Sequence, residues 1–463
     1  MSTTSDLSRF VAGLTLDALP TAVVERTRLL VLDLVGNAVR ARYDAESTPA
    51  LLAAVAALGL AEGSARVFAD DRGYAPAGAA LVNAVLGHSL DFDDTHAAAI
   101  VHPGAPVIPA ALAAAEMVGA SGAETSAAIV AGYEVALRLA LALPAGAHYD
   151  RGFHPSATCG VFGAAAAAAR VFRLDAEHVA SALGIALSQS AGSLQFLSNG
   201  AWTKRFQVGW AGMAGLVAAT LAREGFKGAA EPIEGRHGFL NAYAPAPVPE
   251  RVTRDLGRVF ELMATGVKPY PSCRWGHAGI DAALALRQEL GLEPDEIESA
   301  TLGVSRAGLL LIGEPAAKKA DPRNVVDGQF SGPFVIAVAL GTGRMDWDSY
   351  RLLDDPVIRA LLPKIACSND PEIEAEFPAN MAGKLTLRAR GRVFTRTVIV
   401  PRGEPANFPD EAAFRAKFAG LACAVLGDAG ARALADDVLR LDRLPEAAAL
   451  LRRPRASAAL AAA

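Results

Sequence analysis

The sequence predicts a mostly α-helical protein in which a large helical domain is interrupted by a smaller α+β domain. Three observations support this. Apolar residues recur every three or four positions up to about residue 225, strand-like patterns occur only between residues 263 and 402, and a helical pattern resumes at Asp410. The expected domains are therefore 1–262 together with 403–463 for the helical part, and 263–402 for the α+β part.

The helical part begins with an amphipathic pattern and continues into helices rich in alanine. Residues 21–42 (TAVVERTRLLVLDLVGNAVRAR) have the spacing of a helix with one apolar face. Residues 124–143 and 175–194 are apolar nearly all round, which is typical of helices buried inside a large assembly. Asp175 is expected to cap the second of these helices.

The α+β part contains strand and hairpin patterns. Residues 297–305 (IESATLGVS) predict a strand, and residues 384–400 (KLTLRARGRVFTRTVIV) predict a hairpin that turns near Arg390 and Gly391. Residues 276–291 and 330–343 between them have helical patterns, and a strand–helix mixture of this kind is typical of an α+β module. From Asp410 the pattern is helical again, and the alanine-rich residues 456–463 are expected to form a frayed tail.

Composition excludes several classes of function. The chain has 463 residues, of which 52% are hydrophobic, and its net charge is -5. It therefore lacks the excess positive charge that is typical of proteins that bind nucleic acid or an anionic membrane. The uncharged run 97–115 contains three prolines, so we expect a buried loop that leads into a buried helix rather than a membrane span. Four cysteines far apart in sequence and a polar N-terminus predict a reduced, cytoplasmic protein.

Titratable residues are concentrated in residues 87–104 (GHSLDFDDTHAAAIVHPG). This stretch holds three histidines and three aspartates. If the helix that starts near Ala79 continues through it, then His88, Asp91 and Thr95 share one face, and a carboxylate under apolar packing suits a general base. Clustered Asp and His could instead bind Mg²⁺ or Mn²⁺, or the stretch could be an ordinary charged loop. Only 6% of the chain is aromatic and a second acidic cluster is missing, so the acid/base site is favoured.

Three further stretches add an imidazole and several cations to the predicted site. They are residues 149–160 with His154, residues 199–212 with Lys204 and Arg205, and residues 265–277 with Lys268, Tyr270, Cys273, Arg274 and His277. The sequence lacks a phosphate loop, a dinucleotide-binding glycine motif and a G-x-S-x-G elbow. Cations combined with acid/base groups predict an anionic substrate, most simply one that carries carboxylates.

The order of these motifs resembles the MmgE/PrpD family. The resemblance rests on HSLDFDDTH with HPG, GFHPSATCGVFGAAAAAARV, ALSQSAGSLQF, NGAWTKRFQVGWA and VKPYPSCRWGHAGIDAAL, and it covers nearly the whole chain. It implies a helical domain built from both ends of the chain, a smaller α+β lid domain and a homodimer. It also implies catalysis with no metal and no organic cofactor, through proton transfer at a carbon next to a carboxylate.

The resemblance also implies roles for individual residues. His154 would transfer protons, while Asp91 and His102 would orient the substrate or shuttle protons. Substrate carboxylates and developing negative charge would be held by Lys204 and Lys268, and Thr95 would donate a hydrogen bond. The catalytic candidates are Asp91, His102, His154 and Lys204, and the substrate-binding candidates are Thr95, Lys268, Arg274, Cys273 and His277. His88, Asp93, Asp94 and His96 are expected to shape the turn.

Two positions depart from the decarboxylases of the family. Cys273 stands where a histidine is expected, and Phe334 stands where a tyrosine is expected; Arg274 and His277 could supply replacement contacts. These departures count against decarboxylation and say less about dehydration or epimerisation. The expected reaction is dehydration of a 2-methylcitrate-like hydroxyacid. The alternatives are epimerisation of an iminodisuccinate-like dicarboxylate, decarboxylation of a cis-aconitate-like acid, a metal-dependent reaction at the Asp/His cluster, and a ligand-binding protein without activity.

Overall fold

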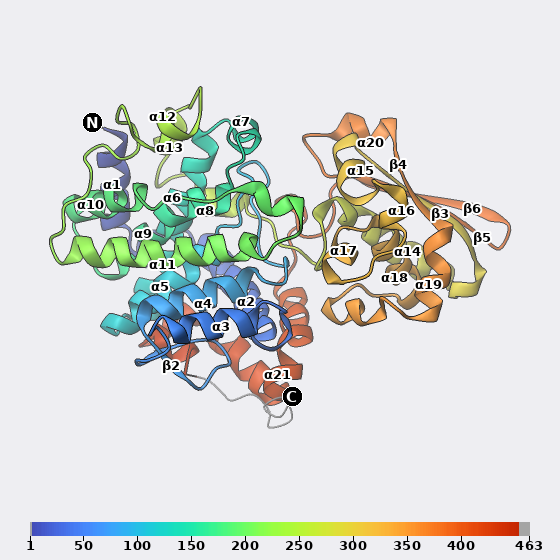
Figure 1. Ribbon diagram of the computed structural model, residues 1–463, viewed down its shortest axis with the longest axis horizontal. Helices are drawn as coiled ribbons and strands as arrows, with labels where there is room; N and C mark the ends of the chain where they lie inside the picture. Colours follow the sequence, from blue (N-terminus) through green and yellow to red (C-terminus); the bar gives the residue numbers. More distant parts are fainter. Residues whose placement is uncertain (1, 453–463) are drawn as a thin grey trace. The chain divides into compact units, whose positions relative to one another are not determined.

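The structure is a computed structural model that describes residues 2–452, and most of these residues lie in helices (Figure 1). The prediction of a mostly α-helical protein is confirmed. The chain forms two compact units, Met1–Gly266 with Asp410–Ala463, and Val267–Pro409. The sequence placed the two domain boundaries a few residues earlier, at 262/263 and 402/403. The predicted tail, residues 456–463, lies outside the described residues.

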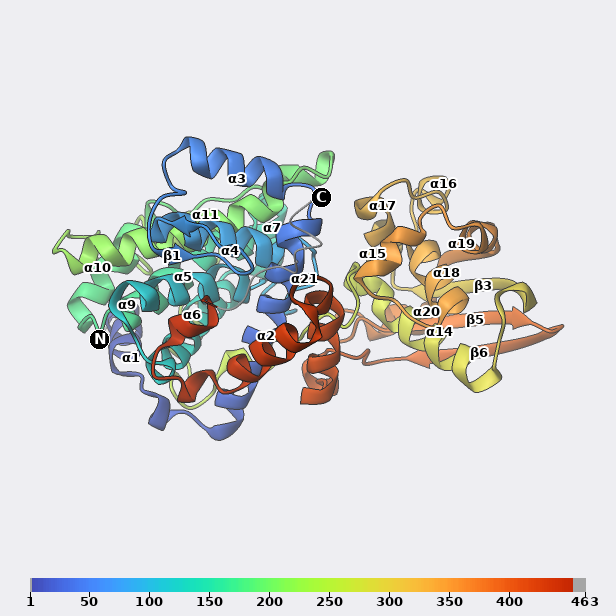
Figure 2. The ribbon, with the colours of Figure 1, turned by 90° about the horizontal axis from the view of Figure 1, so that it is seen from below.

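Helices from both ends of the chain build the larger unit. The red helix α21 lies beside the blue helix α2 in both views, although nearly the whole chain separates them in sequence (Figures 1 and 2). The longer helices are α1 (Thr3–Gly13), α2 (Thr21–Asp44), α3 (Thr48–Ala57), α4 (Pro76–His88), α5 (Gly104–Val118), α6 (Gly122–Ala142), α9 (Gly160–Val171), α10 (Ala176–Leu187), α11 (Thr203–Arg223) and α21 (Glu411–Leu439). Short elements complete the unit, namely β1 (Ala65–Arg66), β2 (Gly73–Tyr74), α7 (Ala145–Asp150), α8 (Pro155–Thr158), α12 (Phe239–Tyr243) and α13 (Glu250–Thr253).

Helix α9 lies at the centre of this unit and packs against α5, α6, α10 and α11. Its run of alanines is fully buried, and small side chains allow the helix backbones to approach closely. The crossing with α6 requires glycine, because a Cβ on Gly132 would lie 2.7 Å from the carbonyl oxygen of Gly163. This contact explains why the central helices contain alanine and glycine in place of larger apolar residues.

Two helices, α6 and α21, are long and apolar enough to cross a membrane by length and composition alone. The most apolar stretch of α6 is 94% buried within the protein, which is typical of a core helix. Helix α6 also carries a buried ion pair, in which Arg138 Nε lies 2.8 Å from Glu134 Oε2. Helix α21 is kinked at Gly427 (φ 69°), so it consists of two shorter helices.

Most local expectations for the helical part are confirmed. Asp175 caps α10 by accepting a hydrogen bond from the His178 amide, and a helix, α21, follows Asp410 as expected. The structure adds that Asp410 caps α21 by accepting a hydrogen bond from the Ala413 amide. The uncharged run forms a loop that becomes the buried helix α5 at Gly104. The prolines do not stop this helix: Pro106 lies in the first turn, where its missing amide costs no hydrogen bond, and Pro109 is accommodated inside.

The smaller unit is a four-stranded sheet with helices. The strand order is β4-β3-β5-β6, with β3 parallel to β4 and antiparallel to β5. The strands are β3 (Ile297–Val304), β4 (Ile365–Asn369), β5 (Gly383–Ala389) and β6 (Arg392–Val398). Helices α14 (His277–Leu290) and α18 (Gly332–Thr342) pack against the sheet and against each other. The remaining helices are α15 (Arg306–Ile312), α16 (Ala316–Lys319), α17 (Val325–Gln329), α19 (Pro356–Leu361) and α20 (Pro371–Glu376).

The predicted strand and hairpin of this unit are confirmed. Strands β5 and β6 pair from Gly383↔Val398 to Ala389↔Arg392, so the turn is Arg390–Gly391. Both turn residues have positive φ (53° and 68°), as a two-residue turn that matches the twist of the strands requires. The long paired strands are visible at the edge of the smaller unit in Figure 2.

Candidate active site

The stretch rich in histidine and aspartate begins at the end of a helix and continues as a loop. Helix α4 ends at His88, and Asp91 has a left-handed backbone (φ 52°), which no α-helix contains. The expectation that His88, Asp91 and Thr95 share one helical face is therefore wrong. After the helix ends, the polar side chains are held by contacts from other elements instead of by helical spacing.

Two residues of the stretch shape the loop, as the sequence indicated. The Asp94 carboxylate accepts hydrogen bonds from the Tyr133 hydroxyl (2.7 Å) and the Gly104 amide (3.1 Å). Burial, together with the neighbouring Asp93 charge, raises the pKa of Asp94 well above its usual range. Nδ1 of His96 accepts a hydrogen bond from the Ala99 amide (3.1 Å), which closes the following turn.

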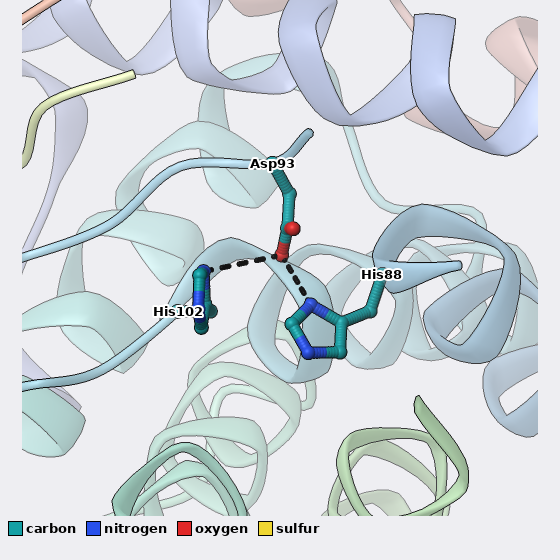
Figure 3. Close-up of side chains that lie close together, drawn as sticks. All are labelled: His88, Asp93 and His102. Atoms are coloured by element: carbon teal, nitrogen blue, oxygen red, sulfur yellow. Dashed lines mark hydrogen bonds and ion pairs between the residues drawn. The ribbon is translucent and has the colours of Figure 1, made fainter. Parts of the chain in front are cut away.

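His88, Asp93 and His102 form the centre of the site (Figure 3). Asp93 Oδ2 lies 2.7 Å from His88 Nδ1 and 3.7 Å from His102 Nδ1. The His102 nitrogen also lies 2.7 Å from the Asp94 carbonyl oxygen and 3.1 Å from the Thr95 hydroxyl. Because carbonyl and carboxylate oxygens can only accept, Nδ1 carries the proton in both rings. Nε2 is therefore the basic nitrogen of each neutral ring, and His102 is 13% exposed.

His154 shows the same arrangement from a different part of the chain. It precedes α8, and its Nδ1 lies 2.9 Å from Gln207 Oε1. The Gln207 amide donates to the Ser193 carbonyl (2.8 Å), which fixes Oε1 as an acceptor and leaves Nε2 of His154 as the basic nitrogen. Burial and the nearby charges of His88 and Lys204 hold the pKa of His154 well below its usual value, so the ring is neutral at pH 7.

Lys204 provides the positive charge of the site. It lies in the first turn of α11, and its ammonium donates to Asp91 Oδ1 at 2.5 Å. Burial opposes the ammonium charge, but the Asp91 carboxylate outweighs this effect and raises the pKa of Lys204. The same ammonium lowers the pKa of both His88 and His154, so these groups share one electrostatic environment.

This arrangement fits an anion better than a metal cation. Within residues 2–452, the side chains close enough to hold a metal together are His88, Asp93 and His102, whose ligand atoms lie within 4.8 Å of one another. Nδ1 of each of these two histidines carries a proton that is engaged in a hydrogen bond, so it offers a metal no lone pair, and only Nε2 could act as the ligand atom of either ring. The Lys204 ammonium would also repel a cation, whereas it attracts a carboxylate.

The other predicted site residues belong to the smaller unit, and all of them are buried. Lys268 is 4% exposed, and Arg274 forms an ion pair with Glu404. The Cys273 amide donates to the Gln329 carbonyl (2.9 Å), and His277 Nε2 lies 3.2 Å from the Ser272 carbonyl at the start of α14. The structure therefore places these four residues on one segment, and it gathers the remaining five, Asp91, Thr95, His102, His154 and Lys204, in the larger unit.

Phe334 has a packing role. It is fully buried in the core of the smaller unit, and its ring stacks on Tyr350 with the centroids 5.9 Å apart. The Tyr350 hydroxyl donates to the Pro271 carbonyl (2.5 Å). A phenylalanine at this core position therefore carries no information about which reaction the protein catalyses.

Sequence reasoning did not assign His88, Asp93 and Gln207 to the site. His88 and Asp93 both lie in the titratable stretch itself, but the helical interpretation directed Asp93 away from the shared face, and His88, although placed on that face, was expected to shape the turn. Gln207 follows Lys204 by three positions, so helical spacing could have placed both on one face of α11. The 53 residues that separate Gln207 from His154 left their contact unpredictable from sequence.

Comparisons with known proteins assign the chain to a family. The models of the MmgE/PrpD N-terminal domain and the MmgE/PrpD C-terminal domain match residues 5–251 and 270–442. The chain is 27% identical to the cis-aconitate decarboxylase-like protein oryM of Aspergillus oryzae, over 97% of this chain and 96% of that protein. It is 26% identical to a cis-aconitate decarboxylase of Aspergillus terreus (97% and 95%) and 28% identical to the human one (64% and 62%). The chain belongs to the MmgE/PrpD family.

Proposed function

We propose that this protein is a cofactor-independent lyase that acts on a small polycarboxylate by proton transfer at a carbon next to a carboxylate. One observation carries the proposal: neutral imidazoles with basic Nε2 atoms lie in one electrostatic environment with a partly buried lysine ammonium. A base that is neutral at pH 7 can remove a carbon-bound proton, and a fixed cation stabilises the enolate-like charge that results. The family and the names of the relatives support the substrate class.

Each group has a defined task in this mechanism. His154 takes the proton through Nε2, and Gln207 holds the ring in the required tautomer. Lys204 turns from Asp91 toward a substrate carboxylate, and Asp91 limits the cost of keeping the ammonium charged while the site is empty. His102, which is partly exposed, takes up a proton from solvent at Nε2 and, as the imidazolium, delivers that proton to the departing hydroxyl. The substrate-binding roles of Thr95, Lys268, Cys273, Arg274 and His277 stay predictions, as do the lid, the homodimer and the cytoplasmic location.

Dehydration of a 2-methylcitrate-like hydroxyacid is the leading reaction. Removing the proton next to a carboxylate and protonating the leaving hydroxyl needs one or two proton-transfer groups, and the site offers more than one imidazole. Decarboxylation is the second candidate, because the relatives named above are cis-aconitate decarboxylases or resemble them. Epimerisation of a dicarboxylate would need the same proton removal followed by return of a proton to the opposite face.

A mass-resolved substrate screen tests the proposal. The purified protein is incubated with 2-methylcitrate, citrate, cis-aconitate and related dicarboxylates, and products are followed by mass. Loss of water supports dehydration, loss of carbon dioxide supports decarboxylation, and an inverted centre without mass change supports epimerisation. If no polycarboxylate is converted, the proposal fails. Thermal stabilisation by a tricarboxylate without conversion would then indicate a binding protein.

A further inference from the structure

A lysine from the C-terminal helix holds the loop that carries the aspartates. The Lys417 ammonium, on α21, donates to the carbonyl oxygen of Phe92 (2.7 Å) and lies 3.7 Å from the centre of the Phe92 ring. It also forms an ion pair with Asp33 of α2 at 2.6 Å. Both charges are shielded from water, since the side chain of Asp33 is 1% exposed and that of Lys417 is 12% exposed.

The hydrogen bond from Lys417 reaches the backbone directly between two aspartates of the site. The Phe92 carbonyl belongs to the peptide that joins Phe92 to Asp93, and Asp91 directly precedes Phe92. Asp91 adopts a left-handed backbone, which a residue other than glycine keeps only when its surroundings hold it there. On the other side, Asp94 is held by Tyr133 and Gly104. Lys417 therefore fixes the segment from which Asp91 reaches Lys204 and Asp93 reaches His88.

Packing between α2 and α21 does not need this ion pair. Gly36 of α2 already lies against the Phe418 ring, and a Cβ at Gly36 would come within 3.1 Å of it. A buried ion pair is generally no more stabilising than a well-packed apolar pair of the same size. What an apolar pair could not do is donate a hydrogen bond to the Phe92 carbonyl.

We propose that Lys417 is a positioning residue that orients Asp91 and Asp93 through the Phe92 carbonyl, with Asp33 as its counter-charge. This inference rests on the proposed function for its effect on catalysis. It also has a consequence that does not depend on activity, because the rings of His88 and His102 take their environment from Asp93 and Asp94. Displacing the loop changes the ¹⁵N chemical shifts of these ring nitrogens.

The test uses the full chain and removes the two charges together. Asp33→Asn/Lys417→Met avoids leaving one buried charge without its counter-charge. A matched control, Arg28→Met/Asp442→Asn, removes another ion pair between α2 and the C-terminal region (2.7 Å) that does not touch the loop. For each variant, kcat, KM, the melting temperature and the histidine ring ¹⁵N shifts are measured with histidine-labelled protein, which contains eight histidines.

We expect Asp33→Asn/Lys417→Met to lower kcat about tenfold or more with KM nearly unchanged, and to move the His88 and His102 shifts. The control should do neither. Lys417→Arg, which keeps a donor for the carbonyl, should restore most of kcat. Asp33→Asn alone, which leaves the ammonium on the carbonyl, should stay within about threefold of wild type, because losses of about ten- to a hundredfold from a residue that holds a site residue in place follow only when its contact is lost.

Unchanged kcat and unchanged ring shifts in the folded double variant would overturn the inference. An equal loss in Asp33→Asn alone would overturn it too, because the loss would then follow from removing the Asp33 charge while the contact with the carbonyl is kept. If the double variant does not fold, a loss of tenfold or more in Asp33→Asn or in Lys417→Arg, each of which keeps a donor on the carbonyl, overturns the inference. If the wild-type protein converts no polycarboxylate, the proposed function fails while the ring shifts still decide whether Lys417 positions the loop.

Discussion

At the scale of single residues, the site depends on which ring nitrogen of each histidine carries the proton. His88, His102 and His154 each direct Nδ1–H to a fixed acceptor, respectively a carboxylate, a backbone carbonyl and a glutamine amide. Such partners set the tautomer and the orientation of an imidazole. The basic Nε2 atoms follow from these partners, and none of the partners is adjacent in sequence to its histidine.

His154→Gln tests the proton-transfer role directly. Loss of the basic nitrogen should lower kcat by about 10²–10⁴-fold, the range that a general base contributes. The substrate identified by the screen would be used to measure kcat and KM. His178→Gln is the matched control, because His178 is exposed and pairs only with the cap residue Asp175. Equal kcat values for wild type and His154→Gln would exclude His154 as the base.

The buried histidines also predict how stability depends on pH. Burial lowers the pKa of His154 and, despite the opposing Asp93 charge, that of His88. Below pH 6.5 the unfolded chain therefore binds protons that the folded protein does not, so the free energy of unfolding falls as pH falls. The loss approaches about 1.4 kcal/mol per pH unit for each such histidine. Urea unfolding at pH 7 and pH 5.5 should show this loss, and His154→Gln should reduce it by about 1–2 kcal/mol. An identical loss in both proteins would contradict the argument.

At the scale of elements, local sequence patterns predicted helices, a cap and the hairpin, whereas the end of α4 was misjudged. The strand at Ile297–Val304, the turn at Arg390–Gly391, the cap Asp175 and the start of a helix after Asp410 are local features that the sequence itself encodes. The loop after His88 is held by Tyr133, Lys204 and Lys417, which are distant in sequence. Periodicity carries no information about such partners, and therefore the site could be predicted only as a set of residue types.

Gly104 tests how tightly the loop is anchored. A Cβ at this position would lie 2.6 Å from the Tyr133 hydroxyl and 2.8 Å from Asp94 Oδ1. Gly104→Ala should therefore destabilise the protein by about 1–3 kcal/mol, because it separates a buried hydrogen-bonded pair. Gly420→Ala is the control: its Cβ would meet nothing within 4 Å inside α21, and alanine there should stabilise by about 0.5–1 kcal/mol. Equal unfolding midpoints for the two variants would show that the anchor is loose.

At the scale of the whole molecule, the chain folds into a helical unit made from both ends and an α+β unit inserted between them. The acid/base residues of the site, together with Lys204, all belong to the larger unit. They come from separate segments of it, namely α4, the loop that follows α4, the loop that precedes α8, and α11. The fold class was predictable from periodicity, because burial patterns are local. The assembly of the site was not, since it depends on how the helices pack.

The protonated Nδ1 atoms and the Lys204 ammonium predict that activity does not require a metal. After dialysis against EDTA, the protein should convert its substrate at the rate of untreated protein. Adding Mg²⁺, Mn²⁺ or Zn²⁺ should not raise that rate. Loss of activity in EDTA that one of these metals restores would mean that His88, Asp93 and His102 bind a metal after all.

Deuterium exchange at the carbon next to a substrate carboxylate tests the central claim most directly. The wild-type protein and His154→Gln are incubated with the polycarboxylate panel in D₂O, and exchange is followed by NMR and mass. The account predicts that wild type incorporates deuterium at that carbon of at least one acid or of its product, and that His154→Gln does so at least about a hundredfold more slowly. Reversible conversion of a polycarboxylate with no exchange at that carbon, or equal exchange by the two proteins, would contradict it.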